Sequence, residues 1–384
     1  MRVAVLLEDR CKPNSNAFAY LQKYSAMCER ECIQFEGDKC KILESACPVC
    51  FNRARHCPDN AVIVINLPEE LDSEMSHCYG ENSFRLFRLP APRLEQVVGI
   101  LGPNGMGKST AVNLLSGSIT PNLGDWSNQT PDWDDVITTF PRGELRDYLA
   151  LLSKEGVSIA VKPQYIDKLP KIFEGEVNEL LERVDDREEI DKYSEALGIG
   201  HILSRKLGSL SGGELQRVAL CATLLKEADV YFFDEPSSYL DIYERMRMVR
   251  IIQDLTATGK RVLVVEHDLA ILDVLCDLLH VVYGERAAYG IFTPARTTRT
   301  AINAYLDGYL PEENVRIRNK PIRFVRGRTR GEDIGLPILK WGDMEKKMGD
   351  FQLTTGQGEV RSAEVIGVVG PNATGKTTMV KMIA

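Results

Sequence analysis

Two segments of the chain carry the spacing Gly-x-x-x-x-Gly-Lys-(Ser/Thr), which is typical of loops that bind nucleotide phosphates. In such a loop, backbone N–H groups and the start of the following helix surround phosphate oxygens, the lysine reaches the β- and γ-phosphates, and the hydroxyl binds Mg²⁺. A glycine-rich turn without a ligand is the alternative for a single copy. The candidate ligands are Gly102, Asn104, Gly105, Gly107, Lys108, Ser109 and Thr110 in the first loop, and Gly370, Asn372, Gly375, Lys376, Thr377 and Thr378 in the second.

The flanks of the two loops match, which argues against that alternative. Apolar runs predicted to be strands, Val97–Leu101 and Val365–Val369, precede the loops, and helical patterns follow at Ala111–Leu115 and Met379–Ile383. The two copies align with an offset of 268 residues, and a repeat of that size indicates tandem domains rather than a solenoid. The sequence therefore predicts nucleoside triphosphate binding in two related domains.

Two carboxylates, Asp234 and Glu235, end an apolar run downstream of the first loop. From such a position Asp234 can hold Mg²⁺ through water, while Glu235 can orient and deprotonate an attacking water molecule. The segment Leu210–Arg217 (Leu-Ser-Gly-Gly-Glu-Leu-Gln-Arg) and a strand end at His267 complete an ordered set. Taken singly, Ser211 could simply cap a helix and His267 could be structural. In this order, after a phosphate loop, they indicate an ATP-hydrolysing core.

Strand-like and helical patterns alternate around these motifs, which implies a mainly parallel sheet covered by helices and hence an α/β fold. Strands are expected at 97–101, 157–161, 229–233 and 261–265, and helices at 107–116, 175–197, 212–226 and 241–257.

The overall composition is ordinary for a globular protein, with 27% charged residues and a net charge of −8 over 384 residues. This balance gives no general nucleic-acid footprint. No apolar run is long enough to span a membrane, and Val3–Leu7 is too short and too soon followed by charges for a signal peptide. We therefore expect a cytoplasmic protein with no membrane and no DNA partner, in a compartment where disulfides are rare.

The cysteines are unevenly distributed, with eight of the ten in the first 78 residues. Cys221 and Cys276 lie in apolar helical patterns and are expected to be core residues. In a reducing compartment the early cysteines point to metal rather than to disulfides. Their order resembles a two-cluster bacterial-type ferredoxin, in which each run of four cysteines gives three thiolates to one cluster and the fourth to the other.

The ordered motifs after the first loop closely resemble those of the ABC ATPases. The resemblance implies that His267 contacts the γ-phosphate region and that Gln164 links the metal to the attacking water. It also implies that an aromatic residue upstream of the loop, Tyr79 or Phe84, stacks on adenine, and Trp341 precedes the second loop in a similar way. Aromatic residues at these positions could equally belong to the core.

A ferredoxin-like module ahead of two ABC domains resembles one family in particular, the ribosome-recycling ABC ATPases of subfamily E, or RNase L inhibitor proteins. Further segments in that family's style are Ala61–Pro68, Phe233–Asp241, Val265–Asp268, Tyr305–Pro311, Lys346–Phe351 and the surroundings of Arg142–Tyr148. The resemblance implies a small α+β ferredoxin-like domain, an ABC-type P-loop NTPase domain and the start of a second ABC domain. The expected boundaries are 1–75 for the iron–sulfur domain, 80–284 for the first ABC domain with a helix–loop–helix insertion at about 134–155, 285–334 for a basic hinge and 335–384 for the incomplete second ABC domain.

Departures from the ferredoxin pattern affect the clusters. The third ligand of the second cysteine run falls on Arg53, and Cys11 and Cys28 are separated as if by an insertion. One 4Fe-4S cluster is expected, and a second lacks a full set of thiolates; a decayed or zinc-occupied module is the alternative. By the ferredoxin exchange rule the first cluster would take Cys11, Cys28, Cys32 and Cys57, leaving Cys40, Cys47 and Cys50 for the second.

The segment from Arg316 to Arg330 contains seven Lys or Arg residues and no acidic residue, with Phe324 among them. A charge run is usually a solvated face, but arginines on a hinge suit phosphate contacts to folded RNA. The resemblance implies that this hinge contacts ribosomal RNA. It also implies three partners: the small ribosomal subunit, a peptide-release factor on the ribosome, and initiation factors.

In the resembled family two ATP molecules lie between head-to-tail ABC domains, and each site joins one phosphate loop to the other domain's Leu-Ser-Gly-Gly-Glu signature. The chain contains one signature, so Lys376 and Thr377 could face Ser211 and Gly213, whereas the site at Lys108 lacks its opposing signature. We therefore expect an incomplete copy of a longer ATPase that splits ribosomes into subunits after termination. The chain alone is expected to bind ATP without recycling ribosomes.

Three other functions fit parts of the sequence. The main one is a non-turnover, ATP-dependent ribosome-binding or assembly protein. The ATPase subunit of a membrane transporter is another, which the cysteine module and the fused second domain argue against. A ferredoxin-type electron carrier is the third, and it requires the cluster.

Overall fold

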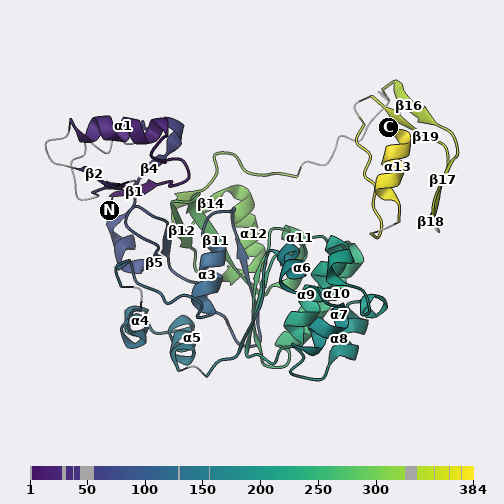
Figure 1. Ribbon diagram of the computed structural model, residues 1–384, viewed down its shortest axis with the longest axis horizontal. Helices are drawn as coiled ribbons and strands as arrows, with labels where there is room; N and C mark the ends of the chain where they lie inside the picture. The colour runs from purple at the N-terminus through teal and green to yellow at the C-terminus, as the bar shows by residue number, and fades with distance from the viewer. Residues whose placement is uncertain are drawn as a thin grey trace.

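The structure is a computed structural model of the chain, and Figure 1 shows its arrangement. An N-terminal unit (purple) sits on a large central α/β domain, and a small unit (yellow) forms the C-terminal part. Within the described part of the chain, no helix combines the length and apolar character needed to cross a membrane. The structure describes residues 2–27, 32–37, 39–43, 56–128, 130–154, 156–324, 335–349, 351–362, 364–372 and 374–384.

In its described residues, the N-terminal unit combines two small antiparallel sheets with helix α1 and two short 3-10 helices. Strands β1 and β4 pair from Arg2 opposite Asn66 to Leu6 opposite Val62, and β2 pairs with β3 as a hairpin. Ser15 starts the helix by accepting a hydrogen bond from the N–H of Phe18, as N-cap residues do. The elements are β1 Arg2–Leu6, α1 Asn16–Ser25, β2 Ile33–Glu36, β3 Lys39–Ile42 and β4 Val62–Asn66.

A compact apolar core holds this unit together. Phe18 and Leu21 of α1 pack with Ile42 of β3 and Val62 of β4, and all four are buried. The Phe18 and Phe35 rings meet edge to face with centroids 5.0 Å apart, an arrangement that favours aromatic packing. Buried cysteines share this core.

The central domain is built on a nine-stranded sheet in the order β5-β6-β12-β11-β7-β10-β9-β8, with β13 paired to β11. Strand β7 lies parallel to β10 and β11, and β9 lies parallel to β10 and β8, which confirms the α/β prediction. The strands are β5 Met75–Cys78, β6 Arg85–Phe87, β7 Val97–Leu101, β8 Ile159–Lys162, β9 Val230–Asp234, β10 Arg261–Val265, β11 Leu278–Glu285, β12 Tyr289–Phe292 and β13 Arg296–Thr297.

Helices cover both faces of this sheet, and the segment 175–197 forms two of them rather than the single helix we expected. Helix α7 ends at Glu182, and α8 begins at Ile190. The helices are α3 Lys108–Leu115, α4 Trp133–Thr139, α5 Glu144–Ser153, α6 Leu169–Ile172, α7 Val177–Glu182, α8 Ile190–Ala196, α9 Gly212–Leu224, α10 Ile242–Thr256, α11 Leu269–Leu275 and α12 Thr298–Asp307. Short 3-10 helices occupy Pro58–Asn60, Glu69–Glu74, Ile166–Lys168, Gly200–Ile202 and Leu207–Ser209.

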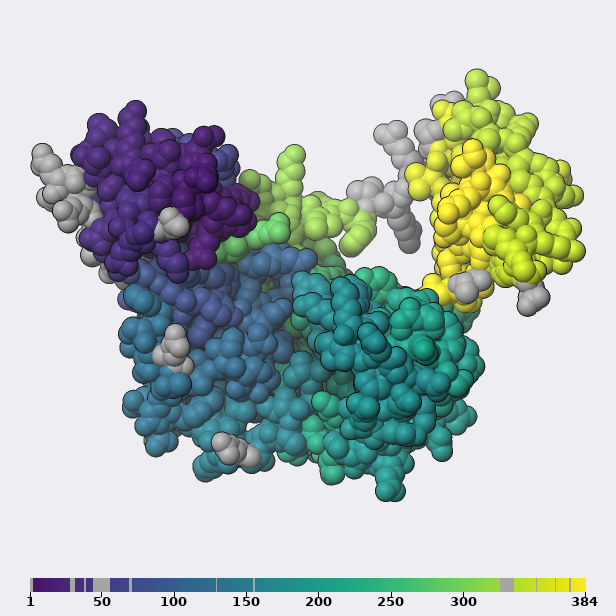
Figure 2. All heavy atoms as spheres, in the orientation of Figure 1, coloured from purple at the N-terminus to yellow at the C-terminus, as the bar shows by residue number. Residues whose placement is uncertain are grey.

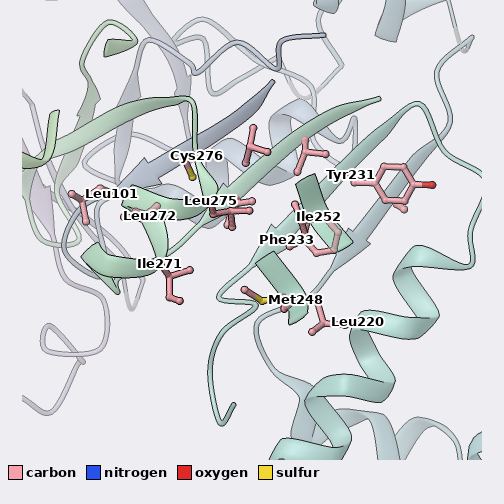
Figure 3. Packing of buried hydrophobic residues seen from close by; sticks show 14 of the residues in the cluster. Leu101, Leu220, Tyr231, Phe233, Met248, Ile252, Ile271, Leu272, Leu275 and Cys276 are labelled. Atoms are coloured by element: carbon pink, nitrogen blue, oxygen red, sulfur yellow. The ribbon is translucent and has the colours of Figure 1, made fainter. Parts of the chain in front are cut away.

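Successive side chains of a strand point to opposite faces of the sheet, so the central strands contribute residues to two separate cores. In β9, Tyr231 and Phe233 join one core, while Phe232 joins the other. Figure 3 shows part of the first core, where Tyr231 and Phe233 lie among side chains from α9, α10 and α11. Helices α3, α4 and α5 line the second core. Burial on both faces fixes the strand ends that carry the candidate functional side chains.

The C-terminal unit corrects one prediction. Residues 365–369 form no strand, and Val365 and Val369 are 97% and 88% exposed. The equivalent strand β7 of the central domain is held between β10 and β11, and the described part of 335–384 supplies no such neighbours. The elements there are β16 Pro337–Trp341, β17 Met344–Met348, β18 Phe351–Thr355, β19 Gly358–Arg361 and α13 Lys376–Ile383, with two antiparallel pairs, β16–β19 and β17–β18.

Two short elements anchor the chain that leaves the central domain. Strands β14 Tyr309–Leu310 and β15 Val315–Arg316 pair beside α12. Arg88 bonds Glu74 at 2.7 Å and Glu313 at 2.6 Å, so the loop after β6 holds the segment between β14 and β15. The hydroxyl of Tyr283 donates to Glu313 as well.

One buried asparagine connects the N-terminal unit to the central domain. The side chain of Asn82 donates to the carbonyls of Ala4 and Ile42 at 3.0 and 2.9 Å and accepts from the N–H of Ile42 at 2.7 Å. Its own carbonyl accepts from the N–H of Leu6. Asn82 therefore satisfies backbone groups of both small sheets from the connector ahead of β6.

We expect Asn82→Ala to loosen the N-terminal unit. Backbone groups of Ala4 and Ile42 lose three hydrogen bonds, and alanine is less suited than asparagine to the positive φ of 56° at this position. The free energy of opening should fall by about 2–4 kcal/mol, measured by hydrogen exchange at the Ile42 amide. Asn303→Ala, on the exposed face of α12, is the matched control and should change it by less than about 0.5 kcal/mol. Unchanged exchange in Asn82→Ala would contradict this account.

Candidate nucleotide-binding site

The first phosphate loop, Gly102–Ser109, joins the end of β7 to the start of α3. Gly105 and Gly107 have φ values of +80° and +85°, a region that side-chain-bearing residues rarely adopt. A Cβ on Gly107 would lie 2.7 Å from Phe84, so only glycine fits against that ring. These two glycines turn the chain sharply enough to present the N-terminus of α3 to a ligand.

Lys108 is buried and folds back over its own loop. Its ammonium donates to the carbonyls of Gly102 and Pro103 at 2.8 and 2.9 Å and to Oδ1 of Asn104 at 3.2 Å. Burial lowers the pKa of Lys108 to about 8, although Asp234 and Glu235 oppose that shift. The Lys108 ammonium thus lies at the loop, where phosphate oxygens of a bound nucleotide could replace these carbonyls as hydrogen-bond acceptors.

Asp234 and Ser109 form a pair suited to a divalent cation. The Ser109 hydroxyl lies 3.4 Å from Oδ2 of Asp234, at the end of β9. Burial, followed by the charge of Glu235, raises the pKa of Asp234. Hard oxygen ligands of this kind suit Mg²⁺, which would also offset the carboxylate charges.

Glu235 gathers the groups expected around an attacking water. Its carboxylate accepts from Nε2 of Gln164 at 2.7 Å and from the Ser238 hydroxyl at 3.3 Å, and Nε2 of His267 lies 3.4 Å away. Burial, followed by the charge of Lys108, lowers the pKa of His267, which favours the neutral ring. The structure therefore brings the predicted catalytic residues together around one carboxylate.

Three buried residues that the sequence reasoning did not select hold these groups in place. Lys162 donates to the carbonyls of Asp234 and Glu235 at 2.9 and 3.3 Å, and Gln216 donates to that of Glu235 at 3.0 Å. Glu266 accepts from the backbone N–H groups of Ser237 and His267. Lys162 stands two residues before Gln164, but its role depends on the pairing of β8 with β9, which the motif does not reveal.

A cavity of about 520 Å³ opens above the loop, and we call it the nucleotide pocket. Tyr79 and Phe84 line it, as the stacking hypothesis requires, and the Tyr79 hydroxyl lies 3.2 Å from that of Thr110. His267 contacts Glu235 but is not among the lining residues. The pocket is lined by Tyr79, Phe84, Asn104, Gly105, Gly107, Lys108, Ser109, Thr110, Gln164, Tyr165, Asp234, Glu235, Arg286 and Ala287.

The second phosphate loop, Gly370–Thr377, lies against the signature side of the central domain, and Figure 2 shows the two units in contact. The N–H of Asn372 donates to Asp241 at 2.9 Å, and its side chain donates to the carbonyl of Tyr239 at 3.2 Å. A Cβ on Gly213 would lie 3.6 Å from that same side chain. The second loop and the signature therefore face each other.

Both motifs at this contact also have local structural roles. Ser211 caps α9, and its hydroxyl and N–H both bond Glu214, so the capping interpretation holds as well. In the second loop, Lys376 donates to the carbonyl of Gly370 at 2.6 Å, as Lys108 does in the first. The aromatic residue next to this loop is Phe351 rather than Trp341. A Cβ on Gly375 would lie 2.9 Å from the Phe351 ring. Thr377 and Thr378 line a cavity of about 500 Å³ beside Lys376.

The cysteines fall into two groups by what the structure describes. Cys11, Cys40 and Cys57 are buried in one core, and burial, with charge interactions among them, raises the pKa of Cys40 to about 12 and that of Cys57 to about 11. Cys32 is buried too. Within the described ranges, no three His, Cys, Asp or Glu side chains are placed to hold one metal ion. Outside the described residues lie Cys28, Cys47, Cys50 and Arg53.

The basic hinge is described only as far as Phe324. Arg318 donates to the carbonyls of Tyr305 and Leu306 and lies over the Tyr305 ring, so its guanidinium serves the fold. Lys320 and Arg323 are exposed, as is Phe324. Residues 325–334, with the remaining basic positions, lie outside the described residues.

Comparison with known proteins places this geometry in a family. The family described as ABC transporter matches residues 93–238. An uncharacterized ABC transporter ATP-binding protein of Methanocaldococcus jannaschii is 42% identical over the whole chain, and ABC transporter E family member 1 of Arabidopsis thaliana is 38% identical. Translation initiation factor RLI1 of Saccharomyces cerevisiae is 37% identical. The chain spans 64% of the length of the first two of these relatives and 65% of the third.

Solved structures agree with the sequence relatives. ABCE1 in a model of ribosome-bound archaeal Pelota and ABCE1 matches the whole chain with a TM-score of 0.92 and 45% identity, and the chain covers 65% of it. The archaeal ribosome recycling factor aABCE1, in complex with the ribosomal stalk protein aP1, matches 82% of the chain with a TM-score of 0.77 and 47% identity, over 60% of its own length. The chain belongs to the RNase L inhibitor family of ABC ATPases, subfamily E.

Proposed function

We propose that the chain binds MgATP in the nucleotide pocket and belongs to an ATP-hydrolysing translation factor that splits ribosomes into subunits after termination. One observation carries the ATPase part: Gln164 and His267 converge on Glu235, next to the buried pair Lys108 and Asp234. The ribosomal part is supported by the relatives, which include proteins named as a translation initiation factor and a ribosome recycling factor. A cytoplasmic location and ties to initiation and ribosome biogenesis belong to the same proposal.

Residues in and next to the pocket would share the tasks of hydrolysis. Lys108 and the N–H groups of the loop would hold the β- and γ-phosphates, and Ser109 with Asp234 would hold Mg²⁺, directly or through water. Glu235 would take a proton from the attacking water, which Gln164 would help to orient. His267, neutral at physiological pH, can donate a hydrogen bond toward the γ-phosphate while it faces Glu235.

The arrangement of the second loop supports head-to-tail pairing of ATP sites. Asn372 bonds Tyr239 and Asp241, which follow the carboxylates Asp234 and Glu235 in the chain, and Gly213 of the signature lies beside it. Lys376 and Thr377 would then bind a nucleotide opposite Ser211 and Gly213. The 384 residues contain no second Leu-Ser-Gly-Gly-Glu to face Lys108. Non-turnover, ATP-dependent binding to ribosomes is therefore the second candidate function for the chain by itself.

Ribosomal partners follow from the same proposal. The small subunit and its RNA, a release factor on the ribosome, and initiation factors are the proposed partners. In the described part of the basic run that starts at Arg316, the exposed cations are Arg316, Lys320 and Arg323, and these would contact phosphates. Arg318 is not proposed for this role, because it is already bonded to backbone carbonyls.

A 4Fe-4S cluster in the N-terminal unit is also a proposal. Soft thiols are the ligands such clusters require, and Cys11, Cys40 and Cys57 are buried together, so they fit in kind. The ligand set proposed from the sequence is Cys11, Cys28, Cys32 and Cys57, and the structure adds Cys40 as a neighbour of two of them. When bound, the cluster would cross-link a unit whose apolar core is small.

Substitutions in the pocket should separate ATP binding from ATP hydrolysis. Lys108→Ala is expected to weaken MgATP binding by more than about tenfold, because it removes the buried cation from the loop. Glu235→Gln should keep binding and lower turnover by about 10²–10⁴-fold, as the loss of a general base does. Isothermal titration and phosphate release, with and without ribosomal subunits, are the measurements. No turnover of the unaltered chain under either condition would favour the non-turnover function.

The lowered pKa of Lys108 predicts that ATP binding takes up a proton. In the free protein its pKa is about 8, so above that pH the lysine is largely neutral, and bound phosphates raise the pKa again. Affinity for MgATP should therefore fall as the pH rises from 7 to 9.5. Titration at pH 8.5 in buffers of different ionisation enthalpy should show up to about one proton taken up, and at pH 7 almost none. Equal proton uptake at both pH values would contradict this assignment.

The cluster proposal predicts a visible absorption band that requires the thiol of Cys57. Anaerobically reconstituted protein should show a broad absorption band near about 400 nm and about four iron ions per chain. Cys57→Ser should lose most of both, because its thiol is assigned to the cluster. Cys78→Ser, buried in the central domain, is the matched control and should retain them. Colourless protein with no bound iron would exclude the cluster.

A further inference from the structure

The hairpin formed by β11 and β12 is packed directly on the first phosphate loop. The N–H of Ala287, at the hairpin tip, donates to the carbonyl of Gly105 at 3.0 Å. A Cβ on Gly102 would lie 2.5 Å from the carbonyl oxygen of Val282, and one on Gly290 would collide with that of Met106. Because the backbones touch at these points, the hairpin tip keeps a fixed position relative to the loop.

This hairpin carries a cation to the mouth of the nucleotide pocket. Arg286, next to Ala287 at the tip, is exposed and lines the pocket together with Lys108 and Thr110. A Cβ on Gly105 would lie 2.8 Å from Cγ of Arg286, so the arginine side chain crosses over the loop where glycine leaves room. No motif of phosphate-binding loops includes this position, which is 178 residues after Lys108 in the sequence.

Within the described residues, Arg286 has no ion pair that would occupy its guanidinium. Asp234 and Glu235, the carboxylates of the pocket, interact with Lys108 and Lys162 instead. A guanidinium presents a planar fork of N–H donors that matches phosphate oxygens, and such charge-assisted bonds are among the strongest hydrogen bonds in proteins. A polyphosphate in the pocket would supply the missing acceptors.

We propose that Arg286 is a nucleotide-binding residue that donates hydrogen bonds to the phosphate tail of the nucleotide from the hairpin side of the pocket. The inference rests on the proposed function, since it takes the pocket to be the site of ATP. It adds the tip of the β11–β12 hairpin, which lines both the nucleotide pocket and the cavity beside β4, to the residues that contact bound phosphate.

The alternative role for Arg286 is to pair with Asp9 of the N-terminal unit instead of with phosphate. Arg286 also lines a second cavity, of about 950 Å³, whose other lining residues include strand β4, Asp9 and Asn60. If Arg286 served mainly to pair with Asp9, removing either residue would loosen the contact between the two units and leave phosphate affinity unchanged. The two roles therefore predict different binding data.

The test is titration of MgATP, MgADP and AMP into the full chain and into Arg286→Ala, Arg286→Lys and Asp9→Asn. Arg286→Ala should weaken MgATP binding by about five- to tenfold and AMP binding by less than about twofold, because the contact is to the phosphate tail. Arg286→Lys should recover part of the loss, since lysine keeps the charge without the fork. Asp9→Asn and the surface control Arg299→Ala should bind like the unaltered chain.

The outcomes separate this inference from the proposed function. If the unaltered chain binds no MgATP, the proposed function fails and the inference fails with it. If it binds MgATP and loses that binding in Lys108→Ala, but Arg286→Ala binds as tightly, only the role of Arg286 is overturned. Equal weakening of MgATP and AMP would also overturn it. Circular dichroism and thermal unfolding confirm that each variant is folded.

Discussion

The buried ammonium group of Lys162 is the interaction on which the geometry of the nucleotide pocket depends. A buried cation requires compensation, and Lys162 obtains it from the carbonyls of Asp234 and Glu235 and from three nearby carboxylates. Burial nevertheless lowers its pKa to about 8. By bonding two consecutive carbonyls, the lysine ties β8 to the end of β9, where Glu235 adopts a positive φ of 47°. At this strained position the Glu235 carboxylate meets Gln164 and His267, so the buried lysine helps to hold the predicted catalytic residues together.

The same pocket is joined to the rest of the molecule through close backbone packing. Glycines let the β11–β12 hairpin touch the phosphate loop, and Arg286 at its tip lies between the nucleotide pocket and the cavity beside β4. Asn82 fastens the N-terminal unit to the connector, while Arg88 fastens the segment at Glu313 through an ion pair. Val3 and Val5 of β1 also pack in the same apolar core as strands of the central domain, so apolar contacts join the two units beside these directional ones.

The local features of the site could be predicted from the sequence, whereas the buried residues that hold the site in place could not. Phosphate loops, capped helices and strand-end carboxylates are encoded in contiguous residues, and the four strands expected around Asp234 are present. Lys162, Gln216 and Glu266 were missed, because their partners come from strands that meet only after folding. The break of 175–197 into α7 and α8 was missed as well, since helical periodicity continues on both sides of residues 183–189.

The second phosphate loop shows which parts of this motif form without a surrounding sheet. Gly375 has φ 89° and starts α13, much as Gly107 with φ 85° starts α3, and Lys376 bonds Gly370 as Lys108 bonds Gly102. A loop of this kind forms from its glycines and one helix turn. The strand before it does not form, because a parallel strand needs neighbours from elsewhere in the chain. The shape of a phosphate loop is thus a local property, whereas the carboxylates proposed to activate water lie on a neighbouring strand, which the described part of this unit does not supply.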